Sequence, residues 1–187
     1  MAIQSRPLTY DDLQGIRETR DERLELIEGE LFVTPSATPL HQDISGNLYI
    51  VFRNVVLESG LGRVFYAPLD VRLAENTIVQ PDLIIILSDR RPVLTTARVE
   101  GAPSLAVEII SPSTSAYDLE TKGNLYAQYG VPEYWLADPD AETITIFSDP
   151  RDGRYRMEET TSDIAISVTI PELSADLKAL FAPVPGL

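Results

Sequence analysis

The stretch Ser104–Asp138, SLAVEIISPSTSAYDLETKGNLYAQYGVPEYWLAD, decides the fold of this chain. It opens with the apolar run Leu105–Ile110, in which Glu108 is the only charged residue. Short apolar runs bounded by prolines are typical of strands that are buried on both faces of a sheet. An isolated carboxylate in such a strand costs on the order of 1–3 kcal/mol even by lenient measures. Glu108 therefore requires a partner, which is a metal ion, a cationic side chain or a proton.

A second segment, Gln80–Leu87, repeats the pattern with Asp82 at the mouth of an apolar strand. Pro81 is tolerated there, because a missing backbone donor matters least at the first position of a strand. Each acid also has an ordinary structural interpretation. Asp82 is equally well explained as a strand-entry residue hydrogen-bonded to a turn, and Glu108 as one half of a buried ion pair, for example with an arginine.

A helix predicted over Ala116–Tyr129 follows the Glu108 strand and carries Lys122. Lys122 shares one stripe with Asp118 and with apolar and aromatic residues, because they recur at spacings of three and four. The stripe predicts that Lys122 points inward across the sheet. Asp118 is explained more simply by a capping box over Ser115–Asp118. Two carboxylates on buried strands and one lysine are suited to a divalent cation and an activated water.

The rest of the chain predicts an α/β protein. A capping box at Thr9 opens a short helix to Arg17, Gly29 centres a hairpin, and a long amphipathic helix runs from Leu40 to about Gly60. Strands are expected over Arg63–Tyr66, Leu69–Leu73, Asp82–Leu87 and Glu133–Leu136. A meander of three further strands is expected over 143–147, 154–158 and 164–170. A weak helix is expected over Val93–Val99 and a last helix over Ser174–Phe181. We expect one domain over residues 1–187, with frayed tails at 1–7 and 182–187.

Composition narrows the classes of function. The net charge of −14 argues against broad affinity for phosphate backbones, although a local cleft is compatible with it. The absence of cysteine excludes disulfides and thiolate metal sites. No apolar run approaches the roughly 20 residues of a membrane span, and the N-terminus has no signal-peptide core. We therefore expect a cytoplasmic protein without a membrane partner.

Other catalytic sites lack support. His41 is the only histidine, which disfavours the usual zinc sites, and it is interpreted as polar surface or cleft lining. No Gly-x-Ser-x-Gly elbow and no glycine-rich phosphate loop occurs. Asp70 and Arg72 alternate with apolar residues and are most simply the polar face of a strand.

Taken as a set, seven phrases resemble the Uma-type family of the PD-(D/E)XK nuclease superfamily, over nearly the whole chain. In that superfamily the usual lysine stands two residues after the glutamate, and this position is Ile110 here. The resemblance therefore implies a lysine that has moved to Lys122 on the following helix. The phrases are Glu25–Glu30, His41-Gln42, Ala67–Val71, Gln80–Leu83, Val107–Thr114, Asp118 with Lys122 and Tyr126, and Gly130–Trp135.

The resemblance implies a restriction-endonuclease-like fold, an α/β mixed central sheet flanked by helices with an antiparallel C-terminal meander. It further implies a Mg²⁺- (or Mn²⁺-) dependent endonuclease that hydrolyses DNA. Asp82, Glu108 and the backbone carbonyl of Ile109 would hold the metal, and Lys122 would orient the attacking water. The alternative is a catalytically inactive nuclease-fold module that serves as a binding or assembly partner. The acidic surface favours this alternative, the intact trio favours the enzyme, and the oligomeric state stays open, with a homodimer as one expectation.

Overall fold

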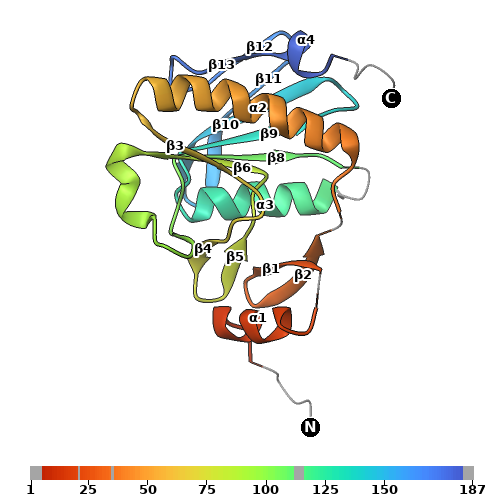
Figure 1. Ribbon diagram of the computed structural model, residues 1–187, viewed down its shortest axis with the longest axis vertical. Coiled ribbons are helices and arrows are strands. Elements are labelled where there is room, and N and C mark those ends of the chain that lie inside the picture. The colour runs from red at the N-terminus through yellow and green to blue at the C-terminus, as the bar shows by residue number, and fades with distance from the viewer. Residues whose placement is uncertain (1–5, 21, 35, 112–115, 183–187) are drawn as a thin grey trace.

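The computed structural model describes residues 6–20, 22–34, 36–111 and 116–182 (Figure 1). Its central element is a six-stranded sheet in the order β11-β10-β9-β8-β6-β3. Only β8 and β9 pair in parallel, so the sheet is mixed, as the sequence predicts. The strands are β3 (Gly62–Tyr66), β6 (Leu83–Leu87), β8 (Leu105–Ile109), β9 (Glu133–Asp138), β10 (Thr143–Arg151) and β11 (Arg154–Thr161).

One long helix covers each face of this sheet (Figure 1). Helix α2 (Pro39–Glu58) packs on one face against Leu105, Val107 and Ile109 of β8. Ala106 packs instead with the side chains of α3 (Ala116–Gln128) on the other face. Because strand side chains alternate, Glu108 points to the α3 face as well.

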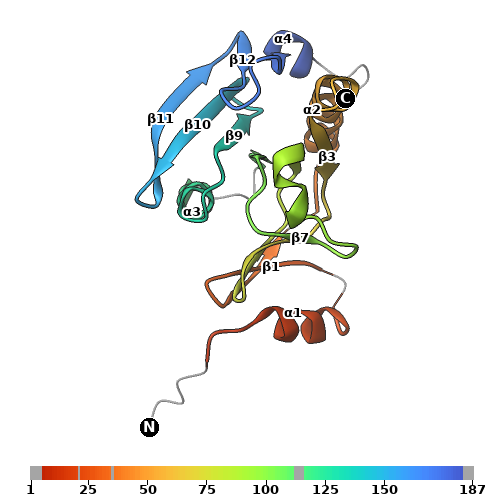
Figure 2. The same cartoon turned by 90° about the vertical axis from the view of Figure 1, so that its left-hand side faces the viewer.

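A second sheet, ordered β2-β1-β5-β4-β7, lies on the α3 side of the central sheet and shares a core with it. Its hairpin β1–β2 has positive φ at Glu28 and Gly29, as the predicted glycine turn requires. Helix α1 (Tyr10–Arg17) closes the outer face of β1, where Leu13 packs with Leu24 and Leu26 (Figure 2). The strands are β1 (Arg23–Ile27), β2 (Glu30–Thr34), β4 (Val71–Ala74), β5 (Thr77–Val79) and β7 (Val99–Glu100).

Several predicted elements differ from the structure. The strand expected over Leu69–Leu73 begins at Val71 and pairs with β5, which the sequence did not predict. The weak helix expected over Val93–Val99 is wrong, because a 3₁₀ turn, η1, occupies Ser88–Val93 and Val99 starts β7. The strand expected over 164–170 ends at Ile166, so the prediction is wrong for the residues that follow.

At the C-terminus, β12 (Ile164–Ile166) leaves the meander and pairs with β13 (Ser174–Asp176). The helix expected over Ser174–Phe181 is only α4 (Leu177–Leu180). It begins late because the Asp176 carboxylate caps it, accepting from the N–H groups of Lys178 and Ala179. The capping box expected over Ser115–Asp118 and most of both expected tails lie outside the residues whose side chains are described.

Candidate active site

The pairing of β6 with β8 brings Asp82 and Glu108 together. Leu83 stands opposite Val107, and the same antiparallel register continued by one residue aligns Asp82 with Glu108. Opposed residues of neighbouring strands have Cβ atoms about 4.5–5.5 Å apart. The two residues are only 6% and 7% exposed, respectively. The two acids that the sequence singled out therefore lie side by side in a buried position.

Asp82 is held in one orientation by two hydrogen-bond partners and one cationic side chain. Its Oδ2 atom accepts from the backbone N–H of Ile109 at 2.9 Å and lies 3.1 Å from Nε2 of His41. Its Oδ1 atom lies 3.7 Å from the guanidinium of Arg23. Burial alone would raise the pKa of Asp82, but His41, the Ile109 amide and Arg23 outweigh it and hold the pKa below its ordinary value. Asp82 is thus an ionised carboxylate held in a fixed orientation.

Glu108 has the opposite balance. Its Oε1 atom accepts from Nζ of Lys122 at 2.9 Å and from the hydroxyl of Tyr126 at 2.7 Å. Burial is nevertheless the larger effect, and together with the charges of Asp82 and Glu25 it raises the pKa of Glu108 to about 7. Burial and the neighbouring acids therefore disfavour a charged Glu108, and an added proton or metal ion would offset that cost.

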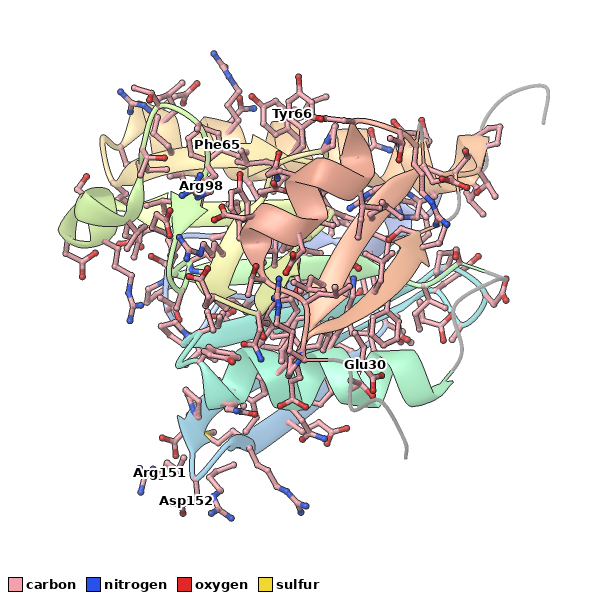
Figure 3. The ribbon with its side chains drawn as sticks, turned by 90° about the horizontal axis from the view of Figure 1, so that it is seen from below. Glu30, Phe65, Tyr66, Arg98, Arg151 and Asp152 are labelled. Carbon is pink, nitrogen blue, oxygen red and sulfur yellow. The ribbon has the colours of Figure 1, made fainter. Side chains whose placement is uncertain are left out.

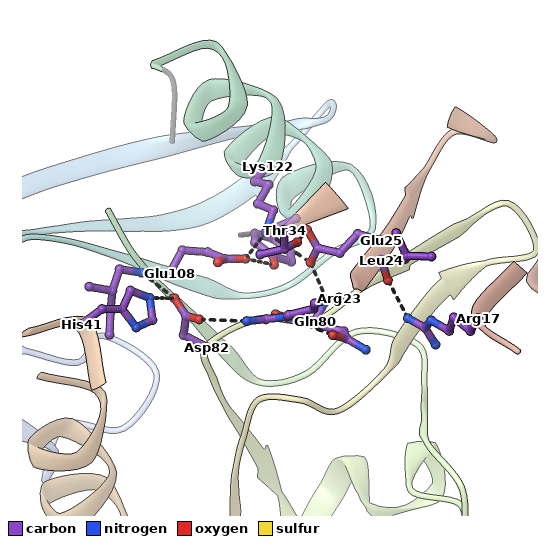
Figure 4. Close-up of polar contacts among 12 residues, drawn as sticks. Arg17, Arg23, Leu24, Glu25, Thr34, His41, Gln80, Asp82, Glu108 and Lys122 are labelled. Atoms are coloured by element: carbon purple, nitrogen blue, oxygen red, sulfur yellow. Dashed lines mark hydrogen bonds and ion pairs between the residues drawn. The ribbon is translucent and has the colours of Figure 1, made fainter. Parts of the chain in front are cut away.

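Lys122 points inward from α3, as the helical stripe predicts, and its side chain is 15% exposed. Besides Glu108, its amine contacts both carboxylate oxygens of Glu25, at 3.2 and 3.0 Å (Figure 4). The two acids offset the effect of burial and raise the pKa of Lys122 above its ordinary value. Lys122 is a cation that bridges two buried acids.

Sequence reasoning did not assign Glu25 to the site. Glu25 comes from β1 of the second sheet, where its neighbours Leu24 and Leu26 face α1. Its Oε1 atom accepts from the Gln80 N–H at 2.6 Å. Burial would raise its pKa, but Lys122, the Gln80 amide and Arg23 hold it below the ordinary value. The alternation of polar and apolar residues over Arg23–Leu26 indicates that Glu25 shares a strand face with Arg23. It does not reveal which part of the protein that face contacts.

The donors present fit magnesium better than zinc. Three carboxylates, Asp82, Glu108 and Glu25, stand against two permanent cations, Lys122 and Arg23. Among the described residues, no group of three or more His, Cys, Asp or Glu side chains is placed so that it could hold a metal ion. Mg²⁺ does not require such a group, because it binds one or two carboxylates and keeps several waters. Asp82, Glu108 and the carbonyl of Ile109 would be the oxygen donors for such an ion.

A small cavity of about 70 Å³ connects the predicted residues, since Asp82, Glu108, Ile109 and Lys122 all line it. A larger groove of about 820 Å³ shares Asp82 and His41 with the cavity. Its charged and aromatic lining residues are Arg17, Glu22, Arg23, His41, Tyr66 and Asp82. The lining of the groove is therefore neither predominantly basic nor predominantly acidic.

His41 lines the cavity and is more than a surface residue. It stands in the first turn of α2, which Thr38 caps by accepting from the His41 N–H at 3.2 Å. Burial would lower the pKa of His41, but its contact with Asp82 reverses the effect and raises it. His41 thus fixes the orientation of Asp82.

Asp70 is not the simple polar strand residue that the sequence suggested. It precedes β4 and accepts from both terminal nitrogens of Arg17, at 2.7 and 3.0 Å, and from the side-chain amide of Gln80 at 2.7 Å. Arg72 does lie on the strand, where it pairs with Glu75. Asp70 therefore supports the loop that carries Gln80 and Asp82.

Comparison with known proteins agrees with this architecture. The family described as "Uma2: Putative restriction endonuclease" matches residues 8–178. An uncharacterised protein of Synechocystis sp. is 26% identical over 139 residues, which are 74% of this chain and 72% of that protein. The crystal structure of a protein from Anabaena variabilis, described as "a putative nuclease belonging to DUF820", superposes with a TM-score of 0.76 at 22% identity and covers 94% of this chain and 98% of that one. The likeness of the two structures confirms the restriction-endonuclease-like fold class.

Proposed function

Because the chain belongs to the Uma2 family, which is described as "Putative restriction endonuclease", we propose that it is a nuclease that requires a divalent metal and hydrolyses DNA phosphodiesters. One observation carries the proposal. Asp82 before β6, Glu108 in β8 and Lys122 in α3 are far apart in sequence and line the same buried cavity. Strands and a helix make a rigid support for such a trio.

In the proposed site, Asp82, Glu108 and the carbonyl of Ile109 would hold Mg²⁺ or Mn²⁺. A metal bound there would neutralise negative charge on the scissile phosphate and lower the pKa of the attacking water. Lys122 orients that water and offsets the charge that develops on the phosphate in the transition state. His41 and the Ile109 amide keep Asp82 in place, and Tyr126 does the same for Glu108.

The strongest support for a non-cleaving binding module is the charge of the chain, −14. Within the groove, Arg17 and Arg23 are already engaged by Asp70 and Asp82. Cleavage distinguishes the two functions. A nuclease needs an activated water and a lysine that orients it, whereas a binding module needs neither.

The test is a cleavage assay on single- and double-stranded DNA with metal-stripped protein, followed by added Mg²⁺ or Mn²⁺. We expect cleavage only with metal and none with Glu108→Gln. Asp152→Asn is the matched control, because Asp152 is an exposed carboxylate at the β10–β11 turn (Figure 3), and it should cleave like the wild type. Cleavage in the presence of a chelator, or by Glu108→Gln at the wild-type rate, would contradict the proposal. Failure of the metal-loaded protein to cut either DNA would favour the binding module.

A further inference from the structure

Tyr66 is an exposed aromatic side chain beside the candidate active site. It ends β3, is 60% exposed and lines the larger groove together with Asp82. Its ring is not loose, because it packs edge-to-face on Tyr49 of α2, with ring centroids 5.0 Å apart and an interplanar angle of 80°. The groove thus contains a rigid aromatic surface that the protein itself leaves open.

The backbone ties Tyr66 to the catalytic end of the sheet. Tyr66 stands opposite Leu83 in the β3–β6 pair, and the next residue, Ala67, donates its N–H to the carbonyl of Asp82 at 3.0 Å. Phe65, which precedes Tyr66, packs into the core on the α3 side, and Tyr66 lies at the outer edge of the molecule (Figure 3). A ligand on the Tyr66 ring therefore lies in the same groove as the metal-binding acid.

The groove is poorly suited to a phosphate backbone. Arg17 is held by Asp70 and Arg23 by Asp82, and Glu22 adds a further negative charge. Duplex DNA binds mainly through phosphates that lysine and arginine neutralise. Stacking on an aromatic ring instead uses the face of an unpaired base and tolerates any sequence. The volume of about 820 Å³ lies in the range of small-ligand sites and accommodates nucleotides.

Resting on the proposed nuclease function, we propose that Tyr66 is a stacking platform for an unpaired nucleobase and that the substrate class is single-stranded nucleic acid. Tyr49 holds the platform, and the strand then runs along the groove to Asp82. A duplex is a substrate only where its strands separate, because a base inside a helical stack offers no free face to Tyr66.

The test measures binding without cleavage, in the presence of a chelator. The probes are short DNA and RNA oligonucleotides with one 2-aminopurine base, each offered single-stranded and as a duplex. We expect single strands to bind at least about 10-fold more tightly than duplexes and to lose 2-aminopurine fluorescence on binding. Tyr66→Leu should weaken single-strand binding by about 5- to 100-fold and abolish the fluorescence change, whereas Tyr66→Phe should retain both. The DNA and RNA arms decide which sugar the groove accepts.

Met157→Ala is the matched control, because Met157 on β11 is 58% exposed and lies outside the groove, and it should bind like the wild type. Unchanged melting of Tyr66→Leu shows that any loss of binding is local. Equal binding of duplex and single strand, or wild-type binding by Tyr66→Leu, overturns the stacking platform even if the protein cleaves DNA. Single-strand binding that depends on Tyr66 upholds the platform even if no metal-dependent cleavage occurs, in which case the nuclease proposal alone fails.

Discussion

Lys122 donates to Glu108 and Glu25 from the middle of α3, so one cation stabilises two buried acids. Removing one partner of a buried pair is more costly than the pair is favourable, because the remaining charge has lost its compensation. We therefore expect Lys122→Met to lower the free energy of unfolding of the metal-free protein by about 3–5 kcal/mol. Urea denaturation in the presence of a chelator measures the loss.

Two variants make this experiment decisive. Lys178→Met removes an exposed lysine whose contact with Asp163 is 3.5 Å long, and it should change stability by less than about 0.5 kcal/mol. Glu25→Gln combined with Lys122→Met should lose less than the sum of the two single variants, because the charges interact directly. Additive losses would show that Lys122 does not stabilise Glu25.

Glu108 gives the metal-free protein a pH dependence. Its pKa of about 7 lies above the ordinary value of 4.5, so the folded protein binds this proton more tightly than the unfolded chain does. The raised pKa of His41 acts in the same direction. The stabilisation from the Glu108 proton is present at low pH and is lost as pH rises through about 7.

The melting temperature of the metal-free protein should therefore rise when the pH is lowered from about 8 to about 6, in the range where Glu108 takes up its proton. Glu108→Gln should flatten the curve, because the amide cannot titrate. Asp82 and Glu25 have lowered pKa values, so the stability that their charged forms contribute is lost only at more acidic pH, where they take up protons. Melting temperatures that stay level or fall between pH 8 and 6 would contradict the charge balance of the site.

At the scale of elements, the β1–β2 hairpin positions Arg23 and Glu25, and Gly29 controls its turn. Gly29 has φ of +86°, and a Cβ placed there would lie 2.4 Å from Cβ of Pro7. Gly29→Ala should therefore cost about 1–3 kcal/mol of unfolding free energy. Denaturation curves measure it.

Gly46→Ala in α2 is the opposite case and the matched control. A Cβ at Gly46 would meet no heavy atom within 4 Å. Alanine is favoured over glycine inside a helix by about 0.5–1 kcal/mol, so this variant should be more stable than the wild type. If both variants were destabilised equally, the positive φ at Gly29 would not be the cause.

The sequence predicts long elements well and short ones poorly. Helix α2 shows a helical apolar period over its 20 residues, and strand β8 lies in a continuous apolar run of the kind that is typical of buried strands. Strand β5 has only the three residues Thr77–Val79, too few for a period, and it exists because β1 and β4 pair with it. At Ser174–Asp176 a helical pattern loses to pairing with β12, which no local signal shows.

The same limit applies to the site. Asp82, Glu108 and Lys122 could be predicted, because a charge in an apolar run or on an apolar stripe needs a partner. Glu25 could not be assigned, because its contact with Lys122 joins residues 97 positions apart across two sheets. Local patterns show that a residue needs a partner, and only the tertiary fold identifies it.

At the scale of the whole molecule, the charge of −14 predicts how nucleic acid binds. With Arg17 and Arg23 engaged by acids, few phosphates can be neutralised and few counterions released. Binding of short single strands should therefore depend only weakly on salt. Titrations at several salt concentrations check this, and a steep loss of affinity with rising salt would point to a basic surface elsewhere on the chain.

The proposed divalent-cation site between Asp82 and Glu108 is tested most directly by calorimetric titration of Mg²⁺ or Mn²⁺ into metal-stripped protein, without nucleic acid. One saturable site should appear, and at a metal concentration 100 times the dissociation constant the protein should gain about 2.7 kcal/mol of stability. Glu108→Gln should lose both the heat of binding and the stabilisation, whereas Asp152→Asn should keep them. Wild-type protein that neither binds nor is stabilised by either metal, or Glu108→Gln that binds as the wild type does, would contradict the metal site.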